Sequence, residues 1–175
     1  LGIEGVNTGV GAYSGYGITA GTYNTALGAL AMGKGWSGVG VVGSSGTRNV
    51  AVGHAALYFQ NNSTGNIGVG FNTFNNGAFA PTLGYNIAIG YYAGAQMTTG
   101  NYNVILGGTQ AVSYATLSNY MIFADGQGNE RFHINNTGDM ILHTIQEHAD
   151  NAAAVTAGLV VGTIYRTNDN LKIVH

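Results

Sequence analysis

The sequence predicts an all-β protein in which β-solenoid repeats are followed by a small β-meander, a short helix and a C-terminal β-hairpin. Three observations predict this fold class. A glycine-centred motif recurs about seven times in residues 1–116, most charged residues come after residue 116, and the later segment has strand-like runs on either side of turn sequences. We therefore expect repeats in 1–116, a β-meander in 117–145, and a helix plus hairpin in 146–175.

The composition excludes several classes of protein. Charged residues make up 7% of the chain and hydrophobic residues 45%, the opposite of a disordered chain. One proline among 30 glycines excludes collagen, and five lysines and arginines are too few for a nucleic-acid footprint. No apolar run approaches the ~18 residues of a membrane span, so we expect no membrane insertion. Without cysteine there are no disulfides or thiolate metal ligands.

The repeat consists of an anchor glycine that follows an aliphatic residue, with an asparagine four positions earlier. Six copies have these Asn–Gly pairs: Asn7 and Gly11, Asn24 and Gly28, Asn49 and Gly53, Asn66 and Gly70, Asn86 and Gly90, Asn103 and Gly107. A seventh, degenerate copy has Trp36 in the asparagine position and Gly40 as its anchor. A unit of about 17 residues cannot bury a core alone, so neighbouring units must stack.

The residue types predict the local structure of each unit. In Asn-Val-Ala-Val-Gly the two valines point one way and the alanine the other, as in a short strand. The inward position is small in five of the copies, as in Ala51 and Gly68. We expect the anchor glycine to adopt a bend or a positive φ, and the asparagine to form either a turn or an amide ladder between units. A second short strand is expected after the anchor, as in residues 54–59 and 91–97.

The last third of the chain is predicted to form three local elements. Residues 119–134 read as a hairpin around the turn 125–128, and the turn 135–138 adds a third strand to form a meander. Residues 146–157 read as a short alanine-rich helix that stops at Gly158. The final residues form two strand-like runs around Asn168-Asp169-Asn170. Because a helix of this length is marginal alone, we expect this tail to trimerise by packing against two symmetry copies.

No catalytic, cofactor or metal site is predicted. Residues 38–43 match the dinucleotide pattern GxGxxG, but they lie inside the repeat and no helix pattern follows them. Paired carboxylates for glycoside hydrolysis could come only from the tail, as Asp125 with Glu130 or Glu147 with Asp150. A three-histidine metal site on a trimer axis could use His143 or His148, but no HxH pair supports it. We expect no enzyme.

Aromatic residues often follow the anchor glycine, and most are expected to pack between coils and chains. The alternative is a shelf on which the faces of sugar rings stack. The candidates for such a receptor contact are Tyr13, Tyr16, Trp36, Tyr58, Phe59, Tyr91 and Tyr92.

The units NVAVGHAAL and NIAIGYYAG resemble the head repeats of trimeric autotransporter adhesins, and still more closely the related repeats of bacteriophage tail fibres and other virion appendages. In the adhesin motif the asparagine lies five residues before the glycine, whereas here it lies four before. The segments SNYMIFADGQGNERFHINNTGDM and AAAVTAGLVVGTIYRTNDNLKIVH are also similar to parts of phage structural proteins. This resemblance implies a left-handed parallel β-roll that assembles as a homotrimer.

The resemblance implies a structural virion protein: a segment of a trimeric phage tail fibre that attaches to the host surface. Its partners would be other virion tail proteins and a glycan or protein receptor on the host. Two alternatives remain open, a trimeric adhesin head on a bacterial cell surface and a fibre-borne polysaccharide depolymerase. Because the chain starts at Leu1 and not at methionine, we expect a processed or truncated piece of a longer protein.

Overall fold

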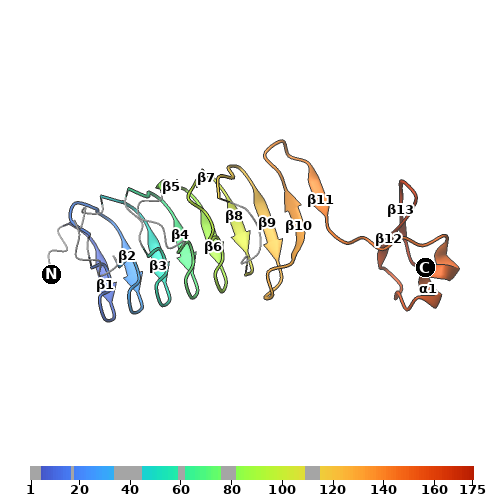
Figure 1. Cartoon of the computed structure of the whole chain (residues 1–175), viewed down its shortest axis with the longest axis horizontal. Coiled ribbons are helices and arrows are strands. Elements are labelled where there is room, and N and C mark those ends of the chain that lie inside the picture. The colour runs from blue at the N-terminus through green and yellow to red at the C-terminus, as the bar shows by residue number, and fades with distance from the viewer. Residues whose placement is uncertain (1–4, 17, 34–44, 59–61, 76–81, 109–114) are drawn as a thin grey trace. The chain divides into compact units, whose positions relative to one another are not determined.

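The computed structural model describes residues 5–16, 18–33, 45–58, 62–75, 82–108 and 115–175 (Figure 1). The chain divides into two compact units, Leu1–Ile141 and Leu142–His175, which we call the first and second units. The degenerate repeat with Trp36 and Gly40, the GxGxxG match at 38–43, and Phe59 lie outside the described residues.

The first unit is a β-solenoid, as the repeat predicts. Its main sheet follows the order β1-β2-β3-β4-β6-β8-β9-β10-β11. The strands from β1 to β9 pair in parallel, and each pair of neighbours aligns equivalent repeat positions, as in Ala26 with Ala51 and Ala51 with Gly68. We call each of these parallel strands, with its loops, a level. The parallel strands are β1 (Thr8–Val10), β2 (Thr25–Leu27), β3 (Val50–Val52), β4 (Ile67–Val69), β6 (Ile87–Ile89), β8 (Val104–Leu106) and β9 (Met121–Ala124).

The seventh level is not the one that the sequence suggests. Strand β2 pairs directly with β3, with Thr25 opposite Val50, so the degenerate copy at 36–40 adds no level between them. The level after β8 is β9, with Val104 opposite Met121. Strand β9 belongs to the segment that the charge pattern assigns to a separate meander. The solenoid sheet therefore continues beyond residue 116, because backbone pairing does not depend on the composition of the loops.

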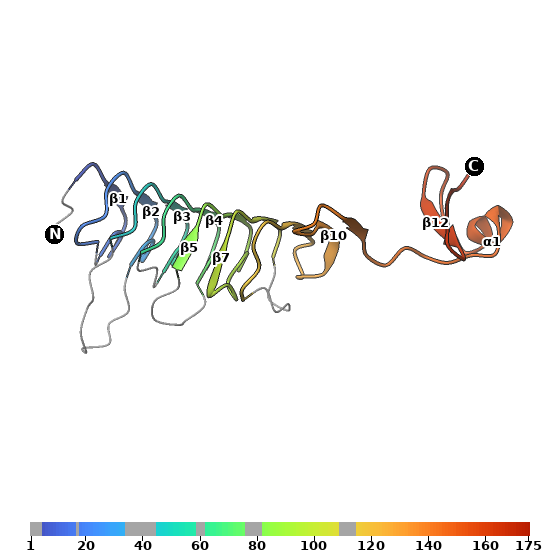
Figure 2. The ribbon, with the colours of Figure 1, turned by 90° about the horizontal axis from the view of Figure 1, so that it is seen from above.

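The second strand of the coil also differs from the expectation. Residues 54–58, placed after the anchor, form turns, with positive φ at Ala55 and Leu57. Their backbone still bonds to both neighbouring levels, from Ala55 N to Ala29 O and from Leu57 N to Thr73 O. A two-stranded parallel sheet of β5 (Thr82–Gly84) and β7 (Thr99–Asn101) instead precedes the asparagine. Figure 2 shows it on the other side of the coil from the main ladder.

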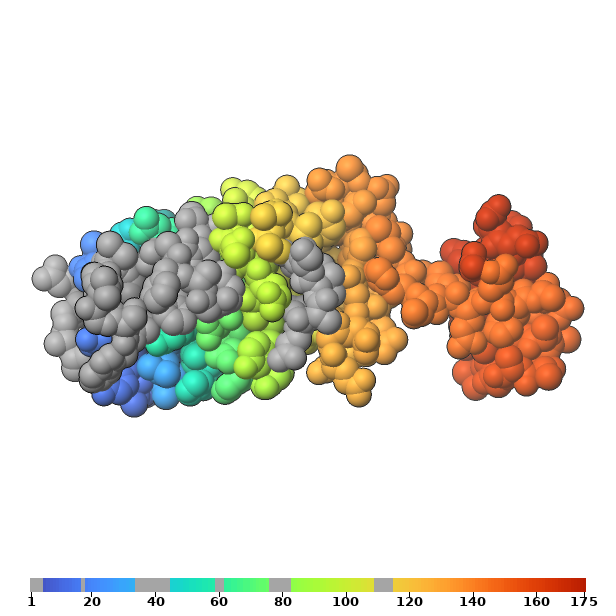
Figure 3. Space-filling model, in the orientation of Figure 1, coloured from blue at the N-terminus to red at the C-terminus, as the bar shows by residue number. Residues whose placement is uncertain are grey.

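The core of the first unit runs along the inside of the coil. The inward position of the strands carries Ala26, Ala51 and Ala88, each at most 2% exposed. Larger side chains from the turns pack against these small ones, and the fully buried Leu57, Phe74 and Met97 are the largest of them. The small strand residues therefore make room for side chains from the opposite wall, and neighbouring levels share one continuous core. On the surface, the described levels follow one another in chain order (Figure 3).

The predicted meander is confirmed, although it is joined to the solenoid. Strand β10 (Glu130–Ile134) pairs antiparallel with β9, with a register shift between Glu130 and Phe132. Strand β11 (Met140–Leu142) follows at the edge of the same sheet. The change from parallel to antiparallel pairing after β9 ends the coil.

The second unit contains the helix α1 (Asn151–Thr156) and a hairpin of β12 (Ile164–Thr167) and β13 (Asn170–Ile173). The hairpin is as predicted, but the helix is shorter than the predicted 146–157. Asp150 caps it by accepting a hydrogen bond from Ala153 N, and residues before it bond to β12 instead, from Arg166 N to Gln146 O. A small core of Ala154, Tyr165 and Val174 joins these elements. Among the described residues, no helix has the length and hydrophobicity needed to cross a membrane.

Candidate functional site

The repeat asparagines form an amide ladder through the first unit, which is one of the two expected roles. Each side-chain oxygen accepts from the backbone N–H of the next asparagine, as from Asn86 N to Asn66 Oδ1 at 3.0 Å. Each side-chain amide donates to the backbone of its own coil or the next, as from Asn66 Nδ2 to Leu83 O at 3.0 Å. Asn24, Asn49, Asn66, Asn86 and Asn103 are buried. At the last level, Tyr120 N donates to Asn103 Oδ1.

The six anchor glycines in the described part of the chain have positive φ, as expected: Gly11, Gly28, Gly53, Gly70, Gly90 and Gly107. They also stack directly on one another. A Cβ placed on Gly53 would lie 2.4 Å from Gly70 O, and one on Gly70 would lie 2.5 Å from Gly90 O. Real contacts of Cβ atoms are longer than 3.0 Å. The repeat residues predicted from the sequence are therefore structural: they hold the levels in register and leave no room for a side chain at the bend.

The outward positions of the parallel strands form an apolar face. We call this the outer face: the residues on either side of the inward position of each strand. They are Thr8, Val10, Thr25, Leu27, Val50, Val52, Ile67, Val69, Ile87, Ile89, Val104, Leu106, Met121 and Phe123. None is buried, and Val10, Leu27 and Ile89 are 44–56% exposed. No charged residue interrupts the face, so the described chain exposes a continuous hydrophobic strip.

The aromatic residues form separate groups. At the position after the anchor, His54, Phe71 and Tyr91 stack one per level, with ring centroids 5.2 and 5.4 Å apart and planes within 13°. We call these three rings the aromatic stack. Tyr92 meets Tyr91 edge-on. Tyr13 and Tyr16 form an edge-on pair at the first level. The other candidates, Trp36 and Phe59, lie outside the described residues.

Tyr58 differs from the other predicted contacts because it is half-buried. Burial raises the pKa of its hydroxyl above the ordinary value. Its ring lies against the backbone of Gly33, where a Cβ would lie 3.0 Å from Tyr58 Cε2. Packing therefore accounts for Tyr58 better than a receptor contact does.

Sequence reasoning missed a second aromatic column at the position before the repeat asparagine. Tyr85 and Tyr102 stack there with centroids 5.4 Å apart and planes within 4°. Tyr23 occupies the same position on the level of β2. The guanidinium carbon of Arg48 lies 6.0 Å from the centroid of the Tyr23 ring. The repeat alignment carries the signal, because all these residues immediately precede an aligned asparagine.

A cavity lies at the end of the aromatic stack. It has a volume of about 160 Å³ and is lined by Tyr91, Gly108, Gly126, Gln127 and Gly128. Gly108 occupies the position after the anchor on the level following Tyr91, and residues 126–128 belong to the turn between β9 and β10. We call this space the end cavity. Its glycine lining gave no sequence signal, since a missing side chain does not mark a motif.

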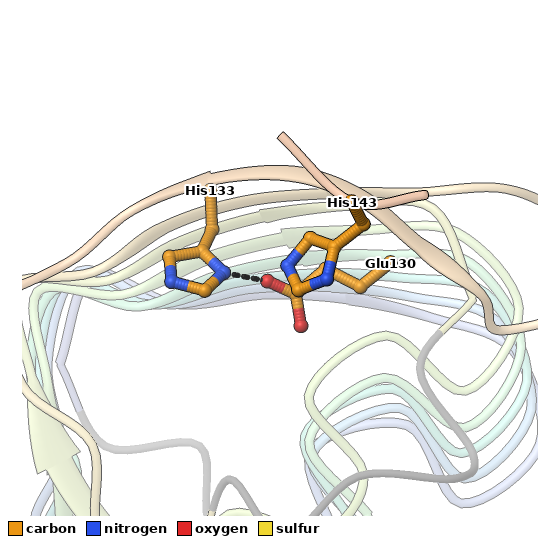
Figure 4. Close-up of side chains that lie close together, drawn as sticks. All are labelled: Glu130, His133 and His143. Carbon is orange, nitrogen blue, oxygen red and sulfur yellow. Dashed lines mark hydrogen bonds and ion pairs between the residues drawn. The ribbon is translucent and has the colours of Figure 1, made fainter. Parts of the chain in front are cut away.

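The tail carboxylates that were considered for hydrolysis have separate structural partners. Asp125 accepts from Asn129 and Arg131, and these hydrogen bonds hold the pKa of its carboxyl well below the usual range. Glu130 forms an ion pair with His133 on the same strand (Figure 4). In the second unit, Glu147 pairs with Arg166 and Asp150 caps α1. Neither proposed carboxylate pair forms a shared site.

The remaining histidines occupy different surroundings. His54 belongs to the aromatic stack. In the second unit, His148 lies near Gln146 and edge-on to Tyr165, and the backbone N–H of His175 donates to Asn151 Oδ1. His143, drawn in Figure 4, also belongs to the second unit. His148 and His175 therefore have structural contacts within the second unit.

Comparisons with protein families, curated proteins and solved structures find no match to this chain.

Proposed function

We propose that this chain is a segment of a trimeric fibre of a virion, a phage tail fibre that attaches to the host surface. The outer face is the observation that carries the proposal. Exposed apolar strips of this extent mark association surfaces. Because every level of the strip has the same register, a second copy in the same orientation can pack against it level by level. Three copies around one axis close such a contact without leaving a free edge.

The low charge of the repeats supports a shaft that resists unfolding and proteolysis. Residues 5–116 contain only Lys34 and Arg48 as charged residues. The amide ladder bonds the levels to one another with buried hydrogen bonds, so opening one level exposes unpaired polar groups on both neighbours. The resemblance of the repeats and tail to phage fibre sequences supplies the choice of a virion over a bacterial adhesin.

Sedimentation tests the assembly. We expect a mass three times the 18.0 kDa of one chain. Val69→Lys places a charge in the middle of the outer face, and we expect it to yield monomers because burying an unpaired charge is costly. Thr99→Lys is the matched control, since Thr99 is an exposed strand residue outside that face, and it should keep the trimer.

Attachment is tested with the labelled full chain on bacterial cells. We expect the chain to bind to the surface of susceptible strains. We also expect antibodies against the chain to detect it on virus particles. A monomer of 18.0 kDa at every concentration would refute the trimer. Antigen on the bacterial surface in place of virions would favour the adhesin alternative.

A further inference from the structure

The aromatic stack advances by one ring per level and then stops. His54, Phe71 and Tyr91 lie on consecutive levels, with nearly parallel planes. One face of the Tyr91 ring packs on Phe71. The next level has Gly108 at this position, so among the described residues no ring continues the series there. Tyr91 remains 56% exposed although it is stacked on one side.

The end cavity occupies the place of the missing ring. Gly108 lies between Tyr91 and the turn 126–128 of the following level, since a Cβ on Gly108 would lie 2.9 Å from Tyr91 O and 3.5 Å from Gly126 O. Two levels at ~4.8 Å each separate Tyr91 from this turn by about 9.6 Å. Rings within the stack are 5.2–5.4 Å apart. The space therefore accommodates one ring layer between Tyr91 and the turn.

The lining selects an uncharged ligand with one apolar face and polar edges. Its described lining consists of Tyr91, three glycines and Gln127, none of which is charged. The nearest carboxylate in sequence, Asp125, is already bonded to Arg131 and Asn129. An aromatic face binds the C–H face of a pyranose, while the Gln127 amide both donates to and accepts from hydroxyls. Its volume of about 160 Å³ is below the ~300 Å³ of sites for drug-sized ligands, which suits a single ring.

We propose that the end cavity binds one neutral pyranose ring of a surface glycan, stacked on Tyr91. The choice of a surface glycan rests on the proposed attachment function. Because Tyr91 is 56% exposed, the rest of a glycan chain can extend into solvent.

The test is a titration of the full chain with methyl glycosides of neutral hexoses, 6-deoxyhexoses and N-acetylhexosamines, followed by ligand-observed NMR. We expect at least one to bind in the millimolar range. Tyr91→Ala should weaken it about tenfold, because the ligand loses the ring on which it stacks. Tyr91→Phe should retain binding because it keeps the ring, and Gln127→Ala should weaken it less than Tyr91→Ala.

Tyr102→Ala is the matched control. Tyr102 is 60% exposed and stacks at 5.4 Å like Tyr91, but it does not line the cavity, so binding should be unchanged. Equal loss in Tyr91→Ala and Tyr102→Ala, or no binding of any glycoside, overturns the proposal. Binding of adenine, but of none of the glycosides, overturns the ligand class. Because this titration uses no cells and needs no trimer, its failure is distinct from a failure of attachment or assembly.

Discussion

The two units of the chain are stabilised in different ways. In the first, equivalent positions of successive levels contact one another: asparagine bonds to asparagine, and glycine lies on glycine. In the second, contacts are made once, by a capped helix, a hairpin and a core of three buried side chains. Glycines with positive φ occur in both, but at Gly158 and Gly162 a Cβ would meet nothing within 4 Å.

This difference means that the same residue type contributes differently to the stability of each unit. A glycine of the solenoid satisfies both a φ requirement and a close backbone approach, whereas a glycine of the second unit satisfies only the φ requirement. An asparagine of the ladder is buried with four hydrogen-bonding neighbours, whereas Asn151 bonds to the exposed chain terminus. Substitutions matched by residue type therefore measure what the repetition contributes.

The largest effect is expected from the glycines. Gly53→Ala should destabilise the first unit by at least about 4 kcal/mol, because its Cβ overlaps the backbone of Gly70 and its φ of 126° is unfavourable for alanine. Gly158→Ala carries only the φ penalty, about 1–2 kcal/mol. Hydrogen exchange with mass spectrometry of the full chain measures the two units separately. Similar losses of protection in both would remove the distinction between them.

A smaller loss is expected from the ladder. Asn66→Ala removes the acceptor of Asn86 N and the donor to Leu83 O. Leaving these two buried groups unpaired should cost about 3 kcal/mol. Asn151→Ala should cost about 1 kcal/mol, because its partners in His175 are exposed to water. Urea denaturation combined with hydrogen exchange gives both values, and a cost for Asn66→Ala no larger than that for Asn151→Ala contradicts a stabilising ladder.

The smallest effect concerns pH. No aspartate or glutamate occurs between residues 5 and 124, so acid should act on the carboxylates that follow this segment, among them Asp125 in the β9–β10 turn. Hydrogen bonds from Asn129 and Arg131 lower the pKa of Asp125 in the folded chain. Its stabilisation is therefore present above the unfolded pKa of about 3.9 and is lost as pH falls through the lower, folded pKa.

An NMR titration checks this by following the amides of Gln127 and Asn129, which donate to Asp125. Their signals should move only in strong acid, and Asp125→Asn should abolish the transition. A midpoint at or above that of an ordinary aspartate would contradict the hydrogen-bonded arrangement.

Much of the solenoid could be predicted because its constraint is repeated. The asparagine and glycine positions recur with nearly the same neighbours, so their stacking follows from the alignment. The last level was missed because Tyr120 stands where an asparagine is expected, and its backbone N–H alone completes the ladder. The turns at 54–58 were mistaken for a strand because residues 55–58 form a short apolar run, while the positive φ of Ala55 and Leu57 cannot be seen from the residue type.

The candidate site could be predicted only in part. Tyr91 was identified because aromatic residues follow several anchors. The end cavity depends on Gly108 and on a turn from the following level, and their proximity is decided by the pairing of β8 with β9. The helix start was misplaced for a similar reason. The hydrogen bond between Gln146 and β12 competes with the helix propensity of residues 146–150.

The amide ladder has a direction, with consequences for how such chains vary in length. Every asparagine passes an acceptor forward, from Asn7 to Asn24 and onward to Asn103. Any whole repeat inserted before Asn103 would receive an acceptor and offer an identical one, so its ends match its neighbours. The backbone N–H of Tyr120 donates to Asn103 Oδ1, but the tyrosine side chain has no amide oxygen to accept from a following level. The repeats are therefore interchangeable, and the ladder ends at Tyr120. Gene duplication can change the length of the solenoid by one level at a time while both ends stay the same.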